Sequence, residues 1–213
     1  MKKILTLFLC TILFISLNAQ NNQAKYYQIK SGYLKTEYSG NTIGTRELWW
    51  DNYGAKSCEL VKTTTTTKFF GMSNTKKAHA VTIRKDSKYW SINYIDKSGV
   101  KGNIDEVIED TEDISEDDLK KMGEEMFNML GGEKQGTETI GGYTCDVYTV
   151  MGAKTWIYKG ISLKSTAKIM GINLNEMFTI FKPNTSVPAS KFVVPKDIEF
   201  KDINQMKHAL YDE

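Results

Sequence analysis

Most of this chain is patterned for β-strands, because apolar and polar residues alternate in one run after another. Trp90, Ile92 and Tyr94 fall on one side of such a run, and the residues between them are polar. Side chains alternate between the two faces of a strand, so this pattern indicates half-buried strands of an antiparallel sheet. The same alternation of aromatic and β-branched residues predicts strands over residues 26–38, 45–50, 57–69, 79–84, 89–95, 143–151, 154–159, 160–172 and 175–181, with a further strand from 137.

Two segments break this pattern and predict helices. The first begins after Ser115, a residue suited to capping a helix N-terminus, and ends at Gly131-Gly132. Its apolar residues recur at helical spacing, and they include Leu119, Met122, Met126 and Met129. Residues 202–210 predict a short C-terminal helix by the same criterion. Strands on both sides of one central helix, without a βαβ rhythm, predict an α+β domain. We expect a curved antiparallel sheet covered by one main helix and a short C-terminal helix.

The first nineteen residues have the three-part pattern of a cleavable signal peptide. Lys2 and Lys3 precede an apolar run over residues 4–17, and Ala19 supplies a small residue at the cleavage point. The run is about 14 residues long and a spanning helix needs about 20, so an uncleaved anchor is the weaker alternative. No later stretch is long and apolar enough to span a membrane. We therefore expect residues 1–19 to be removed on export and 20–213 to form a single domain.

Charge and composition exclude one large class of partners. The chain has 28 Lys and Arg against 26 Asp and Glu, and Lys2 and Lys3 belong to the predicted signal peptide. Without them the basic and acidic residues balance, whereas nucleic-acid binding requires a strongly basic face. We expect no nucleic-acid partner.

Cys58 and Cys145 are the two cysteines that remain after the predicted cleavage. An even pair in an oxidising compartment is compatible with a disulfide, which would close a long loop. Two separately buried thiols are the alternative, since free cysteine packs as a small hydrophobe. The sequence leaves both open.

Catalytic and metal-binding patterns are absent from the sequence. It contains two histidines, His79 and His208, and neither has further ligand types at metal spacing. It has no Gly-x-Ser-x-Gly elbow, Ser-x-x-Lys motif, P-loop or Gly-x-Gly-x-x-Gly turn. We therefore predict a protein without catalytic residues, metal or cofactor.

The surplus of aromatic and methionine side chains indicates an apolar ligand. A curved sheet under a Met-rich helix either packs as a solid core or leaves an apolar cavity, and methionine adapts to acyl chains of varied shape. For the second alternative, the predicted ligand-binding residues are Trp50, Trp90, Ile92, Tyr94, Met122, Met126 and Trp156.

Two stretches resemble a known family. One runs from Ile29 to Tyr38 and continues through Gly-Thr-Arg-Glu-Leu-Trp-Trp-Asp-Asn-Tyr-Gly at 44–54. The other joins Ile-Gly-Gly-Tyr-Thr-Cys-Asp-Val-Tyr at 140–148 to Lys-Thr-Trp-Ile-Tyr-Lys-Gly-Ile-Ser-Leu-Lys at 154–164. Together they resemble secreted bacterial proteins similar to the outer-membrane lipoprotein carriers LolA and LolB. The resemblance implies an antiparallel half-barrel with an apolar cavity that shelters lipid, in the periplasm or envelope of a Gram-negative bacterium.

Three hypotheses about function follow, in descending order. The first is a non-enzymatic envelope protein that binds a lipid or acyl chain, as a carrier does. The second is an interaction or scaffold module with a solid core, whose exposed strand edge binds an envelope protein. The third is a hydrolase with an unfamiliar site.

Overall fold

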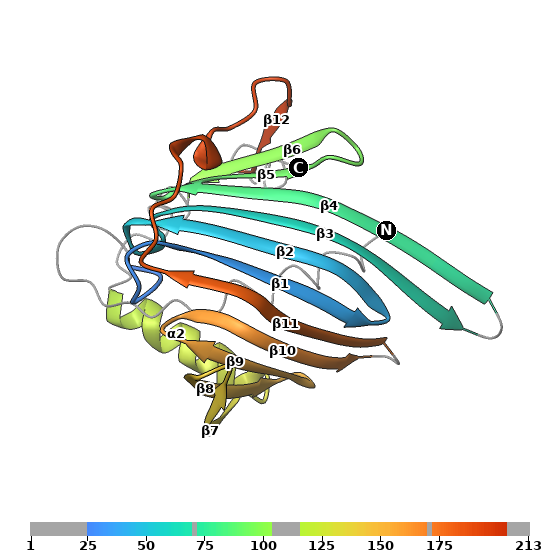
Figure 1. Ribbon diagram of the computed structural model, residues 1–213, viewed down its shortest axis with the longest axis vertical. Coiled ribbons are helices and arrows are strands. Elements are labelled where there is room, and N and C mark those ends of the chain that lie inside the picture. Colours follow the sequence, from blue (N-terminus) through green and yellow to red (C-terminus); the bar gives the residue numbers. More distant parts are fainter. Residues whose placement is uncertain (1–24, 70–71, 104–115, 170–171, 204–213) are drawn as a thin grey trace, which may run out of the picture.

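The computed structural model describes residues 25–69, 72–103, 116–169 and 172–203, with only the backbone at 69, 116–120, 122 and 169. The predicted signal peptide lies outside the described residues. The strands are β1 (Gly32–Gly40), β2 (Thr42–Asp51), β3 (Lys56–Phe69), β4 (Met72–Lys85), β5 (Lys88–Asn93), β6 (Ser98–Asn103), β7 (Glu133–Ile140), β8 (Tyr143–Val150), β9 (Ala153–Tyr158), β10 (Ile161–Ile169), β11 (Ile172–Pro183) and β12 (Phe200–Asp202) (Figure 1). The helical segments are α2 (Glu116–Met129) and two short 3-10 helices, η3 (Asn52–Gly54) and η4 (Ala189–Phe192).

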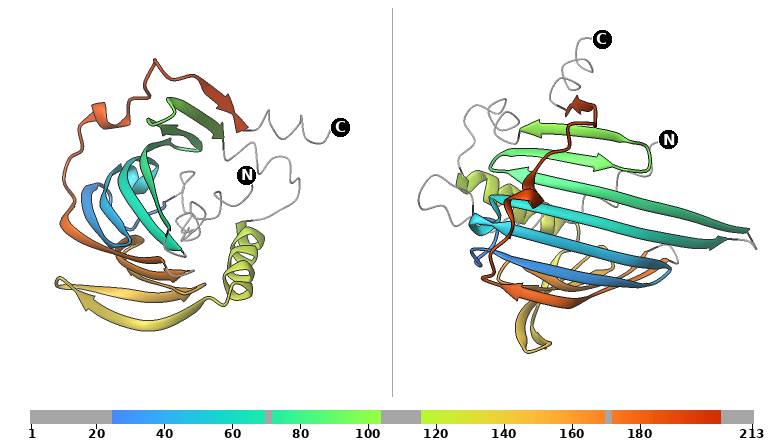
Figure 2. Two further views of the ribbon diagram at one scale, coloured as in Figure 1. Left: turned by 90° about the vertical axis from the view of Figure 1, so that its right-hand side faces the viewer. Right: turned by 45° about the horizontal axis from the view of Figure 1, so that its top comes forward.

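The twelve described strands form one open sheet with the order β12-β6-β5-β4-β3-β2-β1-β11-β10-β9-β8-β7. Neighbouring strands are antiparallel, except that β12 runs parallel to β6. The chain runs outward from β1 to β6, crosses to the opposite edge at β7, and returns until β11 pairs with β1. β1 and β11 therefore join the two halves of the chain at the middle of the sheet, which curls into a half-barrel (Figure 2).

The expectation of an α+β domain with two covering helices is wrong. Among the described residues α2 is the only complete α-helix. The two methionines of its predicted apolar stripe whose side chains are described are exposed, Met126 by 39% and Met129 by 79%. A helix of 14 residues is about 21 Å long. Twelve strands spaced about 4.8 Å apart are roughly 50 Å wide, so α2 is too short to cover the sheet. A C-terminal helix was expected over residues 202–210. Asp202 ends β12 instead, Ile203 is helical, and residues 204–210 lie outside the described residues.

The segment between β11 and β12, residues 184–199, crosses the outside of the half-barrel, and we call it the strap (Figure 2). Phe192 of η4 is buried against Cys58 of β3 and Ile83 of β4. Trp49, Trp90, Val81, Val187 and Val194 pack around this group. The strap therefore supplies the second layer for the outer face, where the sheet would otherwise expose large apolar side chains to water.

Candidate functional site

The inner face of the sheet consists of the side chains that point away from the strap. Alternate residues of a strand point the same way, and directly opposite residues of paired strands share a face. Trp49 of β2 packs in the outer group, so its neighbours Leu48 and Trp50 face inward. Register then places Leu34 of β1 and Glu59 of β3 on the inner face, because both lie opposite Leu48.

One end of the inner face is filled by an aromatic cluster around Trp50. Its indole ring lies 5.7 Å from the ring of Tyr27 and 6.2 Å from that of Phe181, between centroids. The indole N–H donates a 3.0 Å hydrogen bond to the backbone carbonyl of Ile29. Buried members of the cluster include Leu34, Leu48, Cys145, Val147, Trp156, Ile161 and Leu163, with Tyr143, Tyr158 and Phe178 at its edge. This end of the half-barrel is a packed core.

Small side chains form the inner face on the other side of the sheet, over β3 to β6. Register places seven of them together, and each is partly exposed: Val61, Thr63, Ala78, Ala80, Thr82, Ser91 and Val100. Tyr89, at one end of β5, is a larger inward residue beside Gly102. On the outer face of the same strands lie Trp90, Ile92 and Ile83, which are bulky. We call the seven small residues the small-residue wall.

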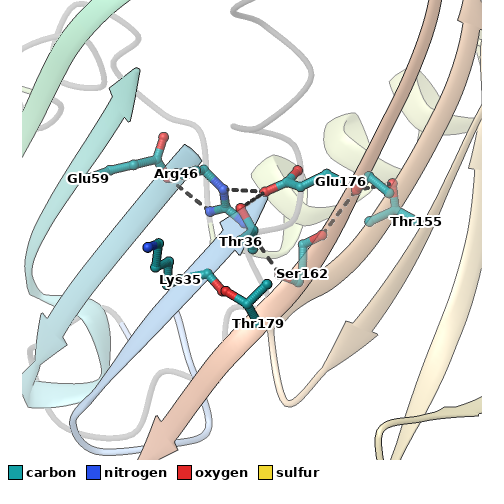
Figure 3. A network of polar contacts seen from close by, with 9 residues as sticks. Lys35, Thr36, Arg46, Glu59, Thr155, Ser162, Glu176 and Thr179 are labelled. Carbon is teal, nitrogen blue, oxygen red and sulfur yellow. Dashed lines mark hydrogen bonds and ion pairs between the residues drawn. The ribbon is translucent and has the colours of Figure 1, made fainter. Parts of the chain in front are cut away.

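Figure 3 shows a buried ionic network around Arg46. On the inner face, Arg46 lies between Leu48 of the aromatic cluster and Val61 of the small-residue wall, which is its partner in the register. Arg46 donates from Nε to Oε1 of Glu176 at 2.6 Å and from Nη1 to Oε2 of Glu59 at 3.2 Å. Its Nη2 donates to the carbonyl of Ser162 at 3.3 Å, and the hydroxyl of Thr36 donates to Oε1 of Glu176 at 2.6 Å. The network thus joins β1, β2, β3, β10 and β11.

Burial of the network affects two neighbouring tyrosines. The pKa of Tyr38 is raised above its ordinary value, first by burial and then by the negative charge of Glu176. The pKa of Tyr27 is raised by burial and by Glu59. Both phenols therefore stay protonated and neutral over the physiological range, and the charges of the network are those of Arg46 and the two carboxylates.

The structure does not bring the seven predicted ligand-binding residues together. Trp50 and Trp156 belong to the packed aromatic cluster. Trp90, Ile92 and Tyr94 point to the outer face, where Trp90 packs with the strap and Tyr94 contacts the ring of His79. Met126 lies on α2, and the side chain of Met122 is outside the described residues.

Sequence reasoning missed the ionic network, although part of its signal was present. Arg46, Leu48 and Trp50 are every second residue of one predicted strand. The prediction of a strand therefore places the arginine on the same face as two apolar residues. An arginine on an apolar face requires a carboxylate partner. Its partner Glu176 is 130 residues away, and no local pattern connects the two.

Cys58 and Cys145 are both free and buried. The structure therefore has two separately buried thiols and not the disulfide. Cys58 lies in the outer group on β3, whereas Cys145 lies in the aromatic cluster on β8. Five strands separate β3 from β8 in the sheet, well beyond the roughly 7 Å limit on Cα atoms that a disulfide can join.

We expect both thiols to react slowly with iodoacetamide in the folded protein. Burial raises the pKa of Cys58 to about 11 and also raises that of Cys145. The reactive thiolate of Cys58 is then about 0.1% of the population at pH 8, against roughly a quarter for an unperturbed thiol. Labelling of Cys58, followed by peptide mapping, should accelerate as the pH rises towards 11. Both cysteines should label in denaturant without a reductant, and a requirement for reduction would contradict this assignment.

Membrane-spanning helices and metal clusters are both missing from the part of the chain that the structure describes. None of its helices combines the length and the apolar character that crossing a membrane requires. Nor do its histidine, cysteine, aspartate and glutamate side chains gather in groups of three or more that could hold a metal ion.

No family model matches this sequence, and no curated protein sequence matches it. Among solved structures, a conserved uncharacterized protein from Thermus thermophilus has a TM-score of 0.49 and 8% identity, over 82% of this chain and 91% of its own. MucB from Pseudomonas aeruginosa, solved in complex with MucA, has a TM-score of 0.46 and 13% identity, over 82% of this chain and 59% of its own. Both scores are below 0.5 and assign neither a family nor a function. The resemblance to LolA and LolB stays a prediction.

Proposed function

We propose that this protein is a non-enzymatic binding protein of the cell envelope, which holds a lipid or another apolar ligand against the inner face of its half-barrel. The predicted signal peptide supports export, and the sequence has no motif that pairs a nucleophile with a base. A carrier-like role fits a curved sheet whose two faces differ in chemistry.

The size difference between the two faces of β3 to β6 is the observation that carries this proposal. Large apolar side chains normally face the interior of a domain, because their burial contributes most to stability. Here Trp90 and Ile83 face outward beneath the strap, whereas Val61 and Ala80 line the inside. Small, partly exposed inward residues leave room for a ligand where bulky ones would fill the half-barrel. An acyl chain bound there would gain about 0.8 kcal/mol for each CH₂ group removed from water.

An unpaired strand edge supports the alternative, a module that binds an envelope protein. Among the described strands β7 pairs only with β8 and forms one end of the sheet. Seven of its eight residues are exposed. An extended segment of a partner could add to such an edge by backbone hydrogen bonds. However, Glu133, Lys134 and Glu138 are charged residues of the kind that discourages strand addition.

Filling the small-residue wall should weaken ligand binding without unfolding the protein. In Val61→Trp, the indole would occupy the inner face, and binding of the neutral probe N-phenylnaphthylamine should fall by at least about tenfold, the loss that 1.4 kcal/mol produces. Lys62→Trp is the matched control, because the next residue of β3 is exposed and points outward. It should bind the probe as the unchanged protein does.

Native mass spectrometry of protein purified from the envelope separates the two functions. Co-purified lipid, lost in Val61→Trp and kept in Lys62→Trp, supports the binding protein. A clean ligand-free mass, together with no uptake of the probe, would overturn that proposal and favour the edge-binding module.

A further inference from the structure

The ionic network uses the hydrogen-bonding capacity of its arginine and carboxylates unequally. Arg46 donates from all three of its nitrogen atoms, to Glu176, Glu59 and the carbonyl of Ser162. Glu176 accepts from Arg46 and from Thr36, but both bonds end on the same oxygen, Oε1. In the described part of the chain, Oε2 of Glu176 and Oε1 of Glu59 accept no hydrogen bond. The network therefore has two carboxylate oxygens that can accept further hydrogen bonds.

The exposures of the two carboxylates show where a ligand could reach them. The side chain of Glu176 is 10% exposed, so water satisfies its second oxygen poorly. The side chain of Glu59 is 28% exposed and lies opposite Thr82 of the small-residue wall. A ligand on the wall would thus contact Glu59 directly, with Glu176 on the other side of the Arg46 guanidinium.

The charge of the network, like its unused acceptors, favours a cationic ligand group. One arginine and two carboxylates give the network itself a net charge of −1. Arg84, the other arginine on this face, does not neutralise it through an ion pair among the described residues. Its guanidinium lies instead over the ring of Tyr26, 4.2 Å from the centroid. An anionic headgroup would meet like charge here, whereas a cationic donor would meet opposite charge.

We propose that Glu59 and Glu176 form the headgroup site of the ligand, and that this site selects an amphiphile carrying a primary ammonium group. The inference rests on the proposed function, because it assigns the acyl chain to the small-residue wall. The ammonium group donates to the unused Oε1 of Glu59, the negative charge of Glu176 across the guanidinium adds to its attraction, and the bonds of Arg46 stay in place. An amphiphile of the same chain length with a carboxylate headgroup lacks both the donors and the charge.

Competition between two amphiphiles of equal chain length tests this selectivity. Tetradecylamine and tetradecanoate, each below its micelle concentration at pH 7, compete with N-phenylnaphthylamine for the protein purified from the envelope. Hydrogen bonds to charged groups are strong enough to give about a tenfold to hundredfold preference. We expect the amine to displace the probe at a concentration at least about tenfold lower than the acid.

Variants of Glu59 and Glu176 test whether these two carboxylates cause the preference for the amine over the acid. Glu59→Gln should reduce the preference for the amine to about threefold or less, and Glu176→Gln should do the same. Glu37→Gln is the matched control, since Glu37 is exposed on the outward-facing positions of β1. It changes the net charge equally and should leave the preference unchanged. If Glu176→Gln fails to fold, Glu59→Gln alone decides the result, because its partly exposed side chain tolerates an amide.

The outcomes separate this inference from the function on which it rests. Equal displacement by the two amphiphiles, or a preference for the acid, would overturn the ammonium site and leave lipid binding intact. A preference that survives in Glu59→Gln would also overturn it. If the probe does not bind at all, the proposed function itself is wrong.

Discussion

Replacing Trp50 with alanine is expected to destabilise the fold by about 3–5 kcal/mol, the range for deleting a large aromatic side chain from a core. Trp50 is fully buried and packs between the rings of Tyr27 and Phe181. The indole packs directly against Gly32 of β1, where even a Cβ atom would collide with it. Because Gly32 has no side chain, β1 offers none that could move into the cavity left by the indole. Urea denaturation followed by circular dichroism measures the change, with the free energy of unfolding extrapolated to water.

Two further variants divide this loss between packing and hydrogen bonding. Trp50→Phe keeps most of the ring but leaves the carbonyl of Ile29 without its donor, and an unsatisfied buried group costs about 1–3 kcal/mol. Trp49→Ala is the matched control on the outer face, because that ring is only partly buried. A loss in Trp49→Ala as large as in Trp50→Ala would contradict the placement of the packed core on the inner face.

Replacing Arg46 with methionine is expected to cost a similar amount, about 3–5 kcal/mol, for an electrostatic reason. The arginine side chain is 9% exposed and pairs with both carboxylates. Methionine fills much of the same volume but leaves the buried charge of Glu176 with the hydroxyl of Thr36 and no cation, which is the costly result of breaking a buried ion pair. The midpoint of urea unfolding should fall accordingly.

A second substitution should recover part of this loss. In Arg46→Met combined with Glu176→Gln, the uncompensated charge is gone, so the double variant should be more stable than Arg46→Met alone. Arg84→Met is the matched control, since it removes the only other arginine, which stacks on Tyr26. Arg84 and Tyr26 are both partly exposed, and a cation–π contact that water reaches is worth about 0.5–1 kcal/mol. Equal losses in Arg46→Met and Arg84→Met would contradict a special role for the network.

The strands with strong alternation were predictable from the sequence, and the weak ones were not. The predicted strands over 89–95 and 143–151 correspond to β5 (Lys88–Asn93) and β8 (Tyr143–Val150). β6 has the sequence Ser-Gly-Val-Lys-Gly-Asn, with two glycines and one β-branched residue, and was not predicted. It forms a strand because it pairs along its length with β5. β12, three residues long, likewise depends on β6.

The helix shows how a correct local pattern can give a wrong architecture. The acidic start and the apolar spacing predict a helix over 115–130, and α2 spans Glu116–Met129. Periodicity identifies one face of that helix but not the area it covers. The covering layer of the outer face is the strap, which carries Phe192 between prolines and has no repeating pattern to identify it.

The sequence by itself determined that this chain makes an antiparallel sheet, and which residues of each strand share a face, because side chains alternate with a period of two. It could not determine which face turns inward. The alternation along β5 separates the residues of its two faces, but it is the same whichever way the sheet curls. The order of the strands decided that, together with the strap. The same order places β11 beside β1, and so brings Glu176 to Arg46 across 130 residues. The candidate site exists only in the tertiary structure, because its charges come from strands whose pairing no local pattern specifies.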